Sequence, residues 1–398
     1  MAITDEEKGV WGVDKVFAKQ NQGSIWDYDA LDPGQLWNAG SNSKGELAQN
    51  NRTQYSSPVQ VPGTNWLSVS SGSQMVLALK TDSTLWAWGS NEVGELGQNA
   101  PQNSDRSSPV QIPGTTWSKI STAGGADLAA AIRTDGSLWT WGSNSQYGNL
   151  GHNEGGWNAR YSSPTQVPGT WSSIDIADYC TIGLKTNGEL YTWGRNYKGA
   201  LGHNQNQGST PGTNSKSSPV QVAGDWTGSK IFGAYNGGAV KSDGTLWIWG
   251  QNDFGNLGQN APTNSHRSSP VQIPGTTWSR VSLRKDMAAG LKTDNTLWVW
   301  GRNNDGSLGI NKSGDDRAGM SSPTQLPGTT WVAVKTGGDF NIATKNDGTL
   351  WAWGGKGTKL AQNNQTYYSS PVQIPGTDWT DDSDKLTAGS SSFFMKKP

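Results

Sequence analysis

Three histidines, one cysteine and two short acidic clusters are the side chains that could give this chain acid–base, nucleophilic or metal-binding chemistry. They are His152, His203, His266, Cys180, the aspartates at 315–316 and the cluster at 381–384. A zinc site needs three or four converging ligands, and a cysteine nucleophile needs a neighbouring base that a third group orients. The sequence shows neither arrangement, so it predicts no catalytic residue, no metal site, no cofactor and no enzyme.

Internal repetition offers a structural interpretation for each of these residues. His152 and His203 stand where other units carry glutamine, and His266 replaces Asp105 in an otherwise nearly identical loop. Cys180 aligns with apolar residues of the other units, so we expect a small buried hydrophobic side chain. The acidic clusters lack the spacing of a calcium loop, and we interpret them as solvated turns.

The elements that would have to position any site come from one motif that occurs seven times. It reads Leu-Trp-x-Trp-Gly, x-Asn, Gly-x-Leu-Gly, a variable loop, Ser-Ser-Pro and Pro-Gly-Thr-x-Trp, with modest variation. The glycine that closes the first phrase recurs about every 50 residues, at Gly40, Gly89, Gly142, Gly194, Gly250, Gly301 and Gly354. A period of this length, rich in strand and turn signals, predicts an all-β chain folded as a seven-bladed β-propeller.

One unit shows how a blade is built. Residues 75–80 are an apolar run that suits a strand buried on both faces, 81–84 form a hairpin turn, and 85–88 form the return strand. Residues 107–112 suit an outer strand, where proline is tolerated. We therefore expect four-stranded antiparallel blades. Their cores would depend on a large share of the 22 tryptophans.

The first and last units are incomplete in complementary ways. The first begins at Leu36 without a preceding hairpin strand, and the chain ends with 392–398, which match that missing strand. We expect the C-terminal strand to pair with residues 36–39 and close the ring, which removes exposed sheet edges. The predicted organisation is a leader or anchor segment, 1–34, followed by the propeller, 35–398.

Charge and hydropathy narrow the classes of partner. The formal net charge is −1 and the pI is near 6.3, so nothing favours nucleic acid. No stretch approaches the ~20 apolar residues that span a bilayer, and the acidic start of the chain lacks the apolar core of a secretory signal. A single cysteine excludes an internal disulfide framework. We expect no nucleic acid, no membrane insertion, and a cytoplasmic location unless the chain joins a larger particle.

The phrase Trp-Gly-x-Asn-x-x-Gly-x-Leu-Gly, as in 88–97 and 249–258, resembles the regulator-of-chromosome-condensation repeat family. This resemblance spans about 35–397 and implies seven-bladed propellers. The family includes a eukaryotic nucleotide-exchange factor, a plant ultraviolet receptor and a bacterial inhibitor of β-lactamases. A basic chromatin-binding tail is not matched, because 1–34 holds three lysines against seven acidic residues, and the receptor's Gly-Trp-Arg-His-Thr string is absent.

A second resemblance is to propeller proteins encoded by tailed bacteriophages. It rests on the leader sequence 6–26, on the style of the repeat, and on nearly identical units such as 100–117 and 261–278. It implies a non-enzymatic structural and interaction module of a virion, as a decoration or tail-associated protein. The alternatives are a bacterial protein inhibitor, a carbohydrate-binding propeller, and a guanine nucleotide exchange factor.

The loops between Gly-x-Leu-Gly-x-Asn and Ser-Ser-Pro vary from five residues (51–55) to twelve (205–216), so they are free to carry recognition. Aromatic residues in and near them are candidate contacts for a partner protein of a larger assembly, or for surface carbohydrate by ring stacking. They can equally cover blade edges. These binding candidates are Trp157, Tyr161, Tyr147, Tyr197, Phe254, Tyr55, Tyr367 and Tyr368, and the anchor candidates in the leader are Trp11, Phe17 and Trp26.

Overall fold

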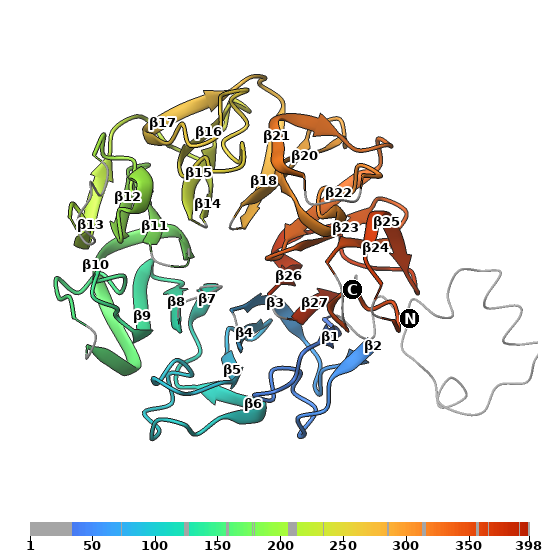
Figure 1. Ribbon diagram of the computed structural model, residues 1–398. Helices are drawn as coiled ribbons and strands as arrows, with labels where there is room; N and C mark the ends of the chain where they lie inside the picture. The colour runs from blue at the N-terminus through green and yellow to red at the C-terminus, as the bar shows by residue number, and fades with distance from the viewer. Residues whose placement is uncertain are drawn as a thin grey trace, which may run out of the picture.

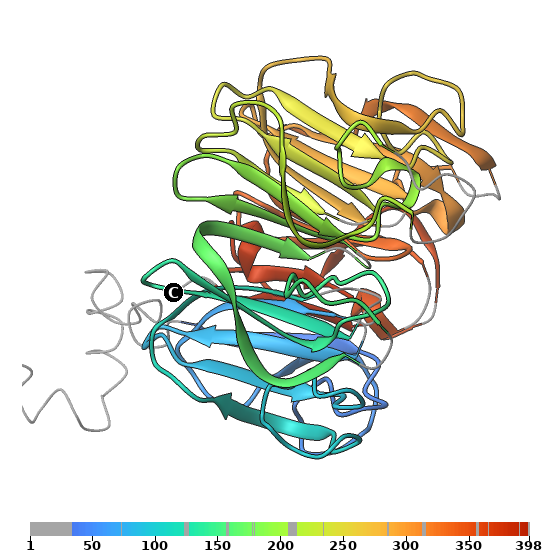
Figure 2. The same cartoon turned by 90° about the vertical axis from the view of Figure 1, so that its left-hand side faces the viewer.

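The structure is a computed structural model that describes residues 34–396, except 73, 123–126, 157–158, 177, 179, 206–212, 234, 285, 313–315, 356–357, 365 and 390. The predicted leader therefore lies outside the described residues, apart from Gly34. The described part is built of strands that stand around a common centre (Figure 1), and Figure 2 shows the same arrangement from the side. None of its helices is long and apolar enough to cross a membrane.

Each repeat unit contributes strands in the order inner, second, third and outer, counted from the centre (Figure 1). The inner strands are β3 (Trp66–Ser71), β7 (Trp117–Thr122), β14 (Lys230–Gly233), β18 (Trp278–Arg284), β22 (Trp331–Thr336) and β26 (Leu386–Ala388). The second strands are β4 (Met75–Lys80), β8 (Leu128–Arg133), β11 (Cys180–Lys185), β15 (Asn236–Val240), β19 (Met287–Lys292), β23 (Phe340–Lys345) and β27 (Ser391–Met395).

The third strands carry the Leu-Trp-x-Trp phrase, and the outer strands carry Ser-Ser-Pro. The third strands are β1 (Leu36–Gly40), β5 (Leu85–Gly89), β9 (Ser137–Ser143), β12 (Leu190–Gly194), β16 (Leu246–Gly250), β20 (Leu297–Asn303) and β24 (Leu350–Gly354). The outer strands are β2 (Tyr55–Gln60), β6 (Arg106–Ile112), β13 (Lys216–Val222), β17 (Arg267–Ile273), β21 (Asp316–Gln325) and β25 (Tyr368–Ile374). The 3₁₀ turns are η2 (Tyr197–Gly199), η3 (Asn304–Gly306), η4 (Thr358–Leu360) and η5 (Ser383–Lys385).

Five of the six sheets are four-stranded and antiparallel, as the sequence predicts. The sixth has seven strands because β10 (Arg160–Ile176) belongs to two units. Its first part pairs with β9 and its second part with β11, and the register shifts between Val167 and Thr170. One continuous strand thus replaces the Pro-Gly-Thr turn that separates the outer strand from the next inner strand elsewhere.

The two ends of the described chain share one sheet, in the order β2-β1-β27-β26. Leu36 pairs with Met395 and Gly40 with Ser391. All five residues of β27 are buried, and Phe393 and Phe394 are inaccessible to solvent. The predicted pairing of the C-terminal strand with residues 36–39 is therefore confirmed.

Contacts between consecutive units, which we call the seams, follow one repeated pattern. The backbone N–H of a turn asparagine donates to the carbonyl of the first serine in the next unit's Ser-Ser pair. The distances are 2.7–2.8 Å for Asn50→Ser107, Asn99→Ser162, Asn153→Ser217, Asn204→Ser268, Asn260→Ser321, Asn311→Ser369 and Asn363→Ser56. The last bond joins the final unit to the first.

Tryptophan wedges fill the same seams. The second tryptophan of the Leu-Trp-x-Trp phrase is fully buried and its indole N–H donates to a turn carbonyl of the preceding unit, as in Trp88→Glu46 at 2.8 Å and Trp249→Ala200 at 2.9 Å. Trp353 is the exception, since its Nε1 has no partner. The equivalent carbonyl, that of Ser307, instead accepts from the Asn341 amide at 2.6 Å.

A cation is held between two aromatic rings at the hairpin side of every unit. The basic residue at the end of the second strand, or directly after it, lies 4.1–5.8 Å from the centroids of two rings. One ring is the tryptophan at or near the start of the inner strand, and the other is the first aromatic residue of the third strand. The seven cations are Lys80, Arg133, Lys185, Lys241, Lys292, Lys345 and Lys396. Such contacts contribute about 0.5–2 kcal/mol each, depending on desolvation.

Candidate functional site

Each histidine makes a hydrogen bond within its own unit, and His266 takes a role that an aspartate has in another unit. His152 Nε2 lies 2.9 Å from the Thr140 hydroxyl, and His203 Nε2 lies 3.0 Å from that of Thr192. His266 Nδ1 accepts from the Asn252 N–H at 3.0 Å, which is the role that Asp105 has for Asn91. Burial is the first cause that lowers the pKa of all three imidazoles.

Cys180 is buried, as expected. Burial raises the pKa of its thiol to about 12, so it is not a thiolate nucleophile at neutral pH. Across the part of the chain that the structure describes, no three His, Cys, Asp or Glu side chains gather as a metal site would require.

The predicted loop aromatics fall into three structural groups. Tyr55, Tyr161 and Tyr368 begin outer strands and pack beside the cores, and each hydroxyl is hydrogen-bonded within its own loop. Tyr147 and Tyr197 flank the Arg195 guanidinium at 4.8 and 4.7 Å. The structure thus brings these two together around one cation.

The remaining two aromatics differ in exposure. Phe254 lies under the guanidinium of Arg302 at 4.7 Å. Tyr367 is 42% exposed, and it is the one exposed binding candidate within the described residues. Trp157, Trp11, Phe17 and Trp26 fall outside the described residues, so their roles stay predictions.

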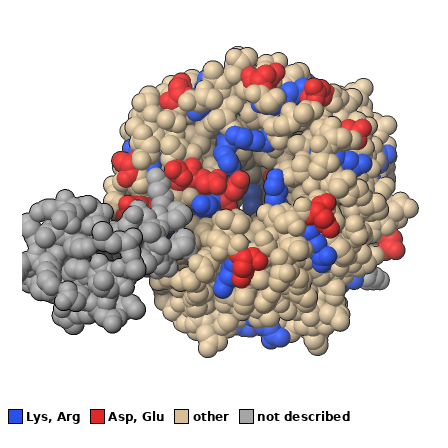
Figure 3. Space-filling view, turned by 180° about the vertical axis from the view of Figure 1, so that it is seen from behind, with Lys and Arg blue, Asp and Glu red and all other residues tan. Residues whose placement is uncertain are grey.

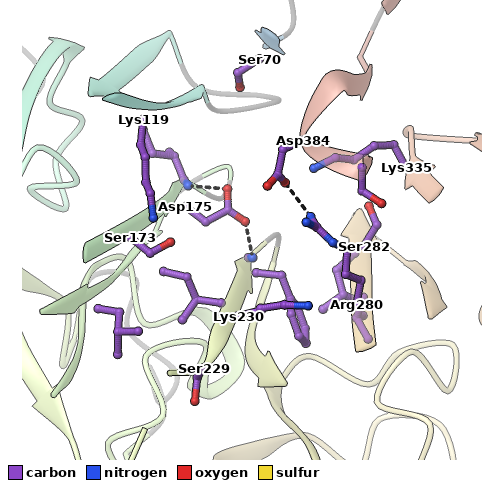
Figure 4. A pocket seen from close by; sticks show the side chains of 18 of the residues that line it. Ser70, Lys119, Ser173, Asp175, Ser229, Lys230, Arg280, Ser282, Lys335 and Asp384 are labelled. Carbon is purple, nitrogen blue, oxygen red and sulfur yellow. Dashed lines mark hydrogen bonds and ion pairs between the residues drawn. The ribbon is translucent and has the colours of Figure 1, made fainter. Parts of the chain in front are cut away.

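The centre of the ring holds a cavity of about 560 Å³ that the sequence did not reveal. It is lined by the inner strands and the turns beside them, and Figure 3 shows charged side chains gathered around this central hollow. The lining includes six basic residues, Lys119, Lys185, Lys230, Arg280, Arg284 and Lys335, but only two acidic ones, Asp175 and Asp384. Figure 4 shows side chains from different inner strands around the same space.

Three of the cations occupy one level of the cavity. Lys119 in β7, Lys230 in β14 and Arg280 in β18 each pair with the residue directly before the stacked cation of the second strand. The strand register therefore places them at equivalent heights on β7, β14 and β18. The inner part of β10, which lies between β7 and β14, carries no cation at this height. Lys119 and Lys230 donate to the carbonyls of Ser172 and Ser279 in the next unit, at 2.5 and 3.0 Å.

Acidic residues in the short segment directly before β26 form ion pairs with the third of these cations, Arg280. Arg280 contacts Asp384 at 2.9 Å and Asp382 at 3.2 Å. Burial opposes ionisation of Asp384, but the charges of Lys335 and Arg280 outweigh it and hold its pKa below the usual value. The cluster at 381–384, which the sequence suggested to be a solvated turn, is thus partly an ion-pair partner at the cavity. Sequence separation hid this contact, since the partners are 104 positions apart in the chain.

Asp175 lies deeper, in the position four residues after the inner tryptophan. Its carboxylate accepts from the Ser121 hydroxyl at 3.0 Å and from the Gly233 N–H at 2.8 Å, so it joins three consecutive units. Loss of solvation raises its pKa, and the charge of Lys335 from the far side of the ring opposes that rise. Elsewhere this position is often serine, as at Ser70 and Ser282 (Figure 4), so the change to a charged residue at 175 and 335 was the available sequence signal.

Comparisons with known proteins agree with the fold. The "Regulator of chromosome condensation (RCC1) repeat" matches residues 82–132, 135–183, 187–229, 243–283 and 294–344, more than half of the chain. The chain is 24% identical over 351 residues to human E3 ubiquitin-protein ligase HERC2, covering 83% of this chain and 7% of HERC2. It is 27% identical over 286 residues to the Ultraviolet-B receptor UVR8 of Arabidopsis thaliana, covering 68% of this chain and 61% of UVR8. The chain thus spans only part of these relatives.

Solved structures give the same result for the fold. Prp20p from Saccharomyces cerevisiae superposes with a TM-score of 0.77 at 20% identity, covering 93% of this chain and 94% of Prp20p. Human WBSCR16 superposes with a TM-score of 0.76 at 17% identity, covering 91% and 98%. At these identities the likeness concerns architecture alone.

Proposed function

Since the chain belongs to the regulator of chromosome condensation (RCC1) repeat family, we propose that it is a protein-interaction module, a rigid propeller that holds a partner protein against its outer loops. This proposal concerns the loops that precede the outer strands. It assigns no catalytic role to the chain, and the activities of the longer relatives are not carried over.

We infer seven blades in a closed ring, with β10 counted in two blades at its register shift. Seven asparagine-to-serine bonds, seven stacked cations and the pairing of β1 with β27 support this count. The bond from Asn363 to Ser56 supports closure, because it repeats between the last and first units the bond found at every other seam. A closed ring has no free sheet edge to distort, so its loops keep fixed relative positions.

The proposed interaction role is supported by a contrast between the constant seams and the variable outer loops. The seams repeat the same bonds from unit to unit, whereas the outer loops differ in length, in sequence and in exposed side chains such as Arg52, Thr263 and Tyr367. Variation on a constant rigid frame is how repeat scaffolds present distinct contact surfaces. A partner protein of a larger assembly fits such a surface better than a small substrate does.

The setting in a bacteriophage virion stays a prediction, and the similarities to HERC2, UVR8 and Prp20p do not support it. Surface carbohydrate is a less favoured ligand, because four of the candidate rings already contact an Arg or His side chain. The exchange-factor alternative has one specific point in its favour. The structure of Prp20p, which has the same architecture, was described together with its binding properties to Gsp1p and histones.

The test is an arginine scan of outer loops against a partner identified with the full-length protein. Thr53→Arg, Thr263→Arg and Tyr367→Arg alter three separate loops, and Thr115→Arg alters an exposed turn on the opposite side as the matched control. We expect at least one loop variant to weaken binding about tenfold or more in calorimetry, which equals about 1.4 kcal/mol. The Thr115→Arg variant should bind like the wild type.

Two outcomes would contradict the proposal. Wild-type affinity in all three loop variants would remove the outer loops as the contact surface. Accelerated nucleotide release from purified small GTPases, with no loss in the loop variants, would instead favour the exchange-factor alternative.

A further inference from the structure

The central cavity has more positive than negative charge, and its cations are not all used by the fold. Six basic residues line it against two acidic ones. Arg280 is paired with Asp382 and Asp384, and Lys185 lies over the rings of Trp171 and Tyr191. The positive charges of Lys119, Lys230 and Lys335 are not accounted for by such contacts.

Three ammonium groups in the cavity have no carboxylate within ion-pair distance among the described residues. Lys119 and Lys230 donate only to backbone carbonyls, which carry no net charge. Lys335 makes no hydrogen bond or ion pair with any described residue, although its side chain is half-buried in the cavity wall. Lys335 is thus half-buried with no directly bound counter-charge, and Lys119 and Lys230 add positive charge from more exposed positions. A bound anion would stabilise these charges together.

These groups act on one shared space. The positive charge of Lys335 affects Asp175 on the opposite side of the ring and Asp384 at the same time, and Lys119 also affects Asp384. Burial is the first cause that lowers the pKa of Lys230, and the neighbouring charge of Arg280 lowers it further. Figure 4 shows these side chains around one pocket, with Lys119, Lys230 and Lys335 on different inner strands. An anion in the cavity would feel all of them together.

We propose that the central cavity binds a dianionic phosphate group, held among Lys119, Lys230 and Lys335. A doubly charged oxyanion gains about twice the Coulomb energy of a carboxylate at the same place. Lysine ammonium groups suit phosphate as point charges that can adapt to its tetrahedral oxygens. The volume of about 560 Å³ admits inorganic phosphate or a small phosphomonoester but not a folded domain. This site is separate from the outer loops, so it holds whether or not they bind a partner.

Calorimetry of the full chain at low ionic strength tests the site with three probes. Inorganic phosphate and phosphoserine distinguish a free anion from a phosphomonoester, and acetate reports the preference for a double charge. We expect saturable one-to-one binding of at least one phosphate probe, and binding of acetate at least tenfold weaker. Added salt should weaken binding.

Lysine variants locate the bound group. Lys335→Met should weaken phosphate binding tenfold or more, and Lys335→Arg should keep most of it. Lys119→Met, at an exposed position, provides a second test if Lys335→Met folds poorly, which circular dichroism and melting would show. The matched control is Lys312→Met, which removes the same charge from an exposed outer loop.

A gain in affinity gives an independent test that no folding defect can imitate. Asp384→Asn removes a negative charge from the cavity and releases Arg280 from one ion pair, so phosphate should bind several-fold more tightly. Asp378→Asn makes the same charge change at an exposed turn and should leave binding unchanged. The proposal is overturned if no phosphate probe saturates, if Lys312→Met weakens binding as much as the cavity variants, or if Asp384→Asn does not strengthen it.

Discussion

The seams and the inner strands differ in how they use the same seven-fold repetition. At the seams, each unit offers the same backbone N–H, the same serine carbonyl and, in six units, the same tryptophan wedge. Along the cavity, one register position holds Ser70, Asp175, Ser282 or Lys335. The seams must satisfy buried polar groups and fill space identically, whereas the cavity wall faces solvent and tolerates change. The contacts that repeat from unit to unit therefore hold the units together, and the positions that vary between units give the cavity its particular charges.

Removal of residues 391–398 should cause the largest loss, since it breaks the sheet that joins the two ends. It deletes the whole of β27, including the buried Phe393, Phe394 and Met395. Losing even two such side chains costs more than about 5 kcal/mol, so we expect a much lower melting temperature or no cooperative transition. Phe393→Leu is the control and should cost far less. A truncated chain that melts like the full one would reject closure by β27.

A tryptophan wedge should cost more to remove than a stacked surface tryptophan on the same strand. Trp249→Ala deletes a fully buried ring and its bond to Ala200, with an expected loss of about 3–5 kcal/mol in denaturant unfolding. Trp247→Ala deletes a half-buried ring that stacks on Lys241, with a loss of about 1–2 kcal/mol. Equal losses of unfolding free energy in the two variants would show that the buried seam tryptophan contributes no more to stability than the stacked surface tryptophan.

The burial of acid groups beside a seam gives a pH-dependent test. Burial, then the charges of Glu95 and Glu92, raise the pKa of Asp127 to about 6. A raised acid pKa means that the folded chain binds the proton more tightly, so stability from this group falls as pH rises from about 4 through 6. Asp127→Asn should match the wild type near pH 4 and be more stable at pH 8, by at most about 3 kcal/mol.

The control for this test is an aspartate with the opposite shift. Backbone and side-chain hydrogen bonds from Thr227 lower the pKa of Asp225. Its contribution to stability is present above the unfolded pKa and is lost as the pH falls, so Asp225→Asn should not become more stable at pH 8. Unfolding midpoints measured from pH 4 to 8 decide both cases.

Glycine substitutions should show the smallest effects, with a clear difference between a seam and an open turn. Gly94 has a φ of +90°, and an added Cβ would lie 2.7 Å from the Cα of Ser162 in the next unit. We expect Gly94→Ala to cost about 1–3 kcal/mol in unfolding free energy. Gly338→Ala meets no atom within 4 Å and should be neutral within about 1 kcal/mol. A neutral Gly94→Ala would show that the seams can relax.

The sequence by itself determined the strands, the hairpins, the repeat and the pairing of β27 with β1, because each depends on local alternation, on turn residues or on complementary incomplete units. It also placed Cys180 in the core and gave the histidines structural roles, through comparison of equivalent positions. The tertiary structure alone showed that β10 runs through two sheets, that Arg195 lies between Tyr147 and Tyr197, and that Asn341 takes the carbonyl that Trp353 would use. It also gathered Lys119, Lys230 and Lys335 from three units around one cavity. Their positions depend on how the units are arranged around the common centre, and electrostatic contact across that space cannot be read from residues that lie in separate repeat units far apart in the chain.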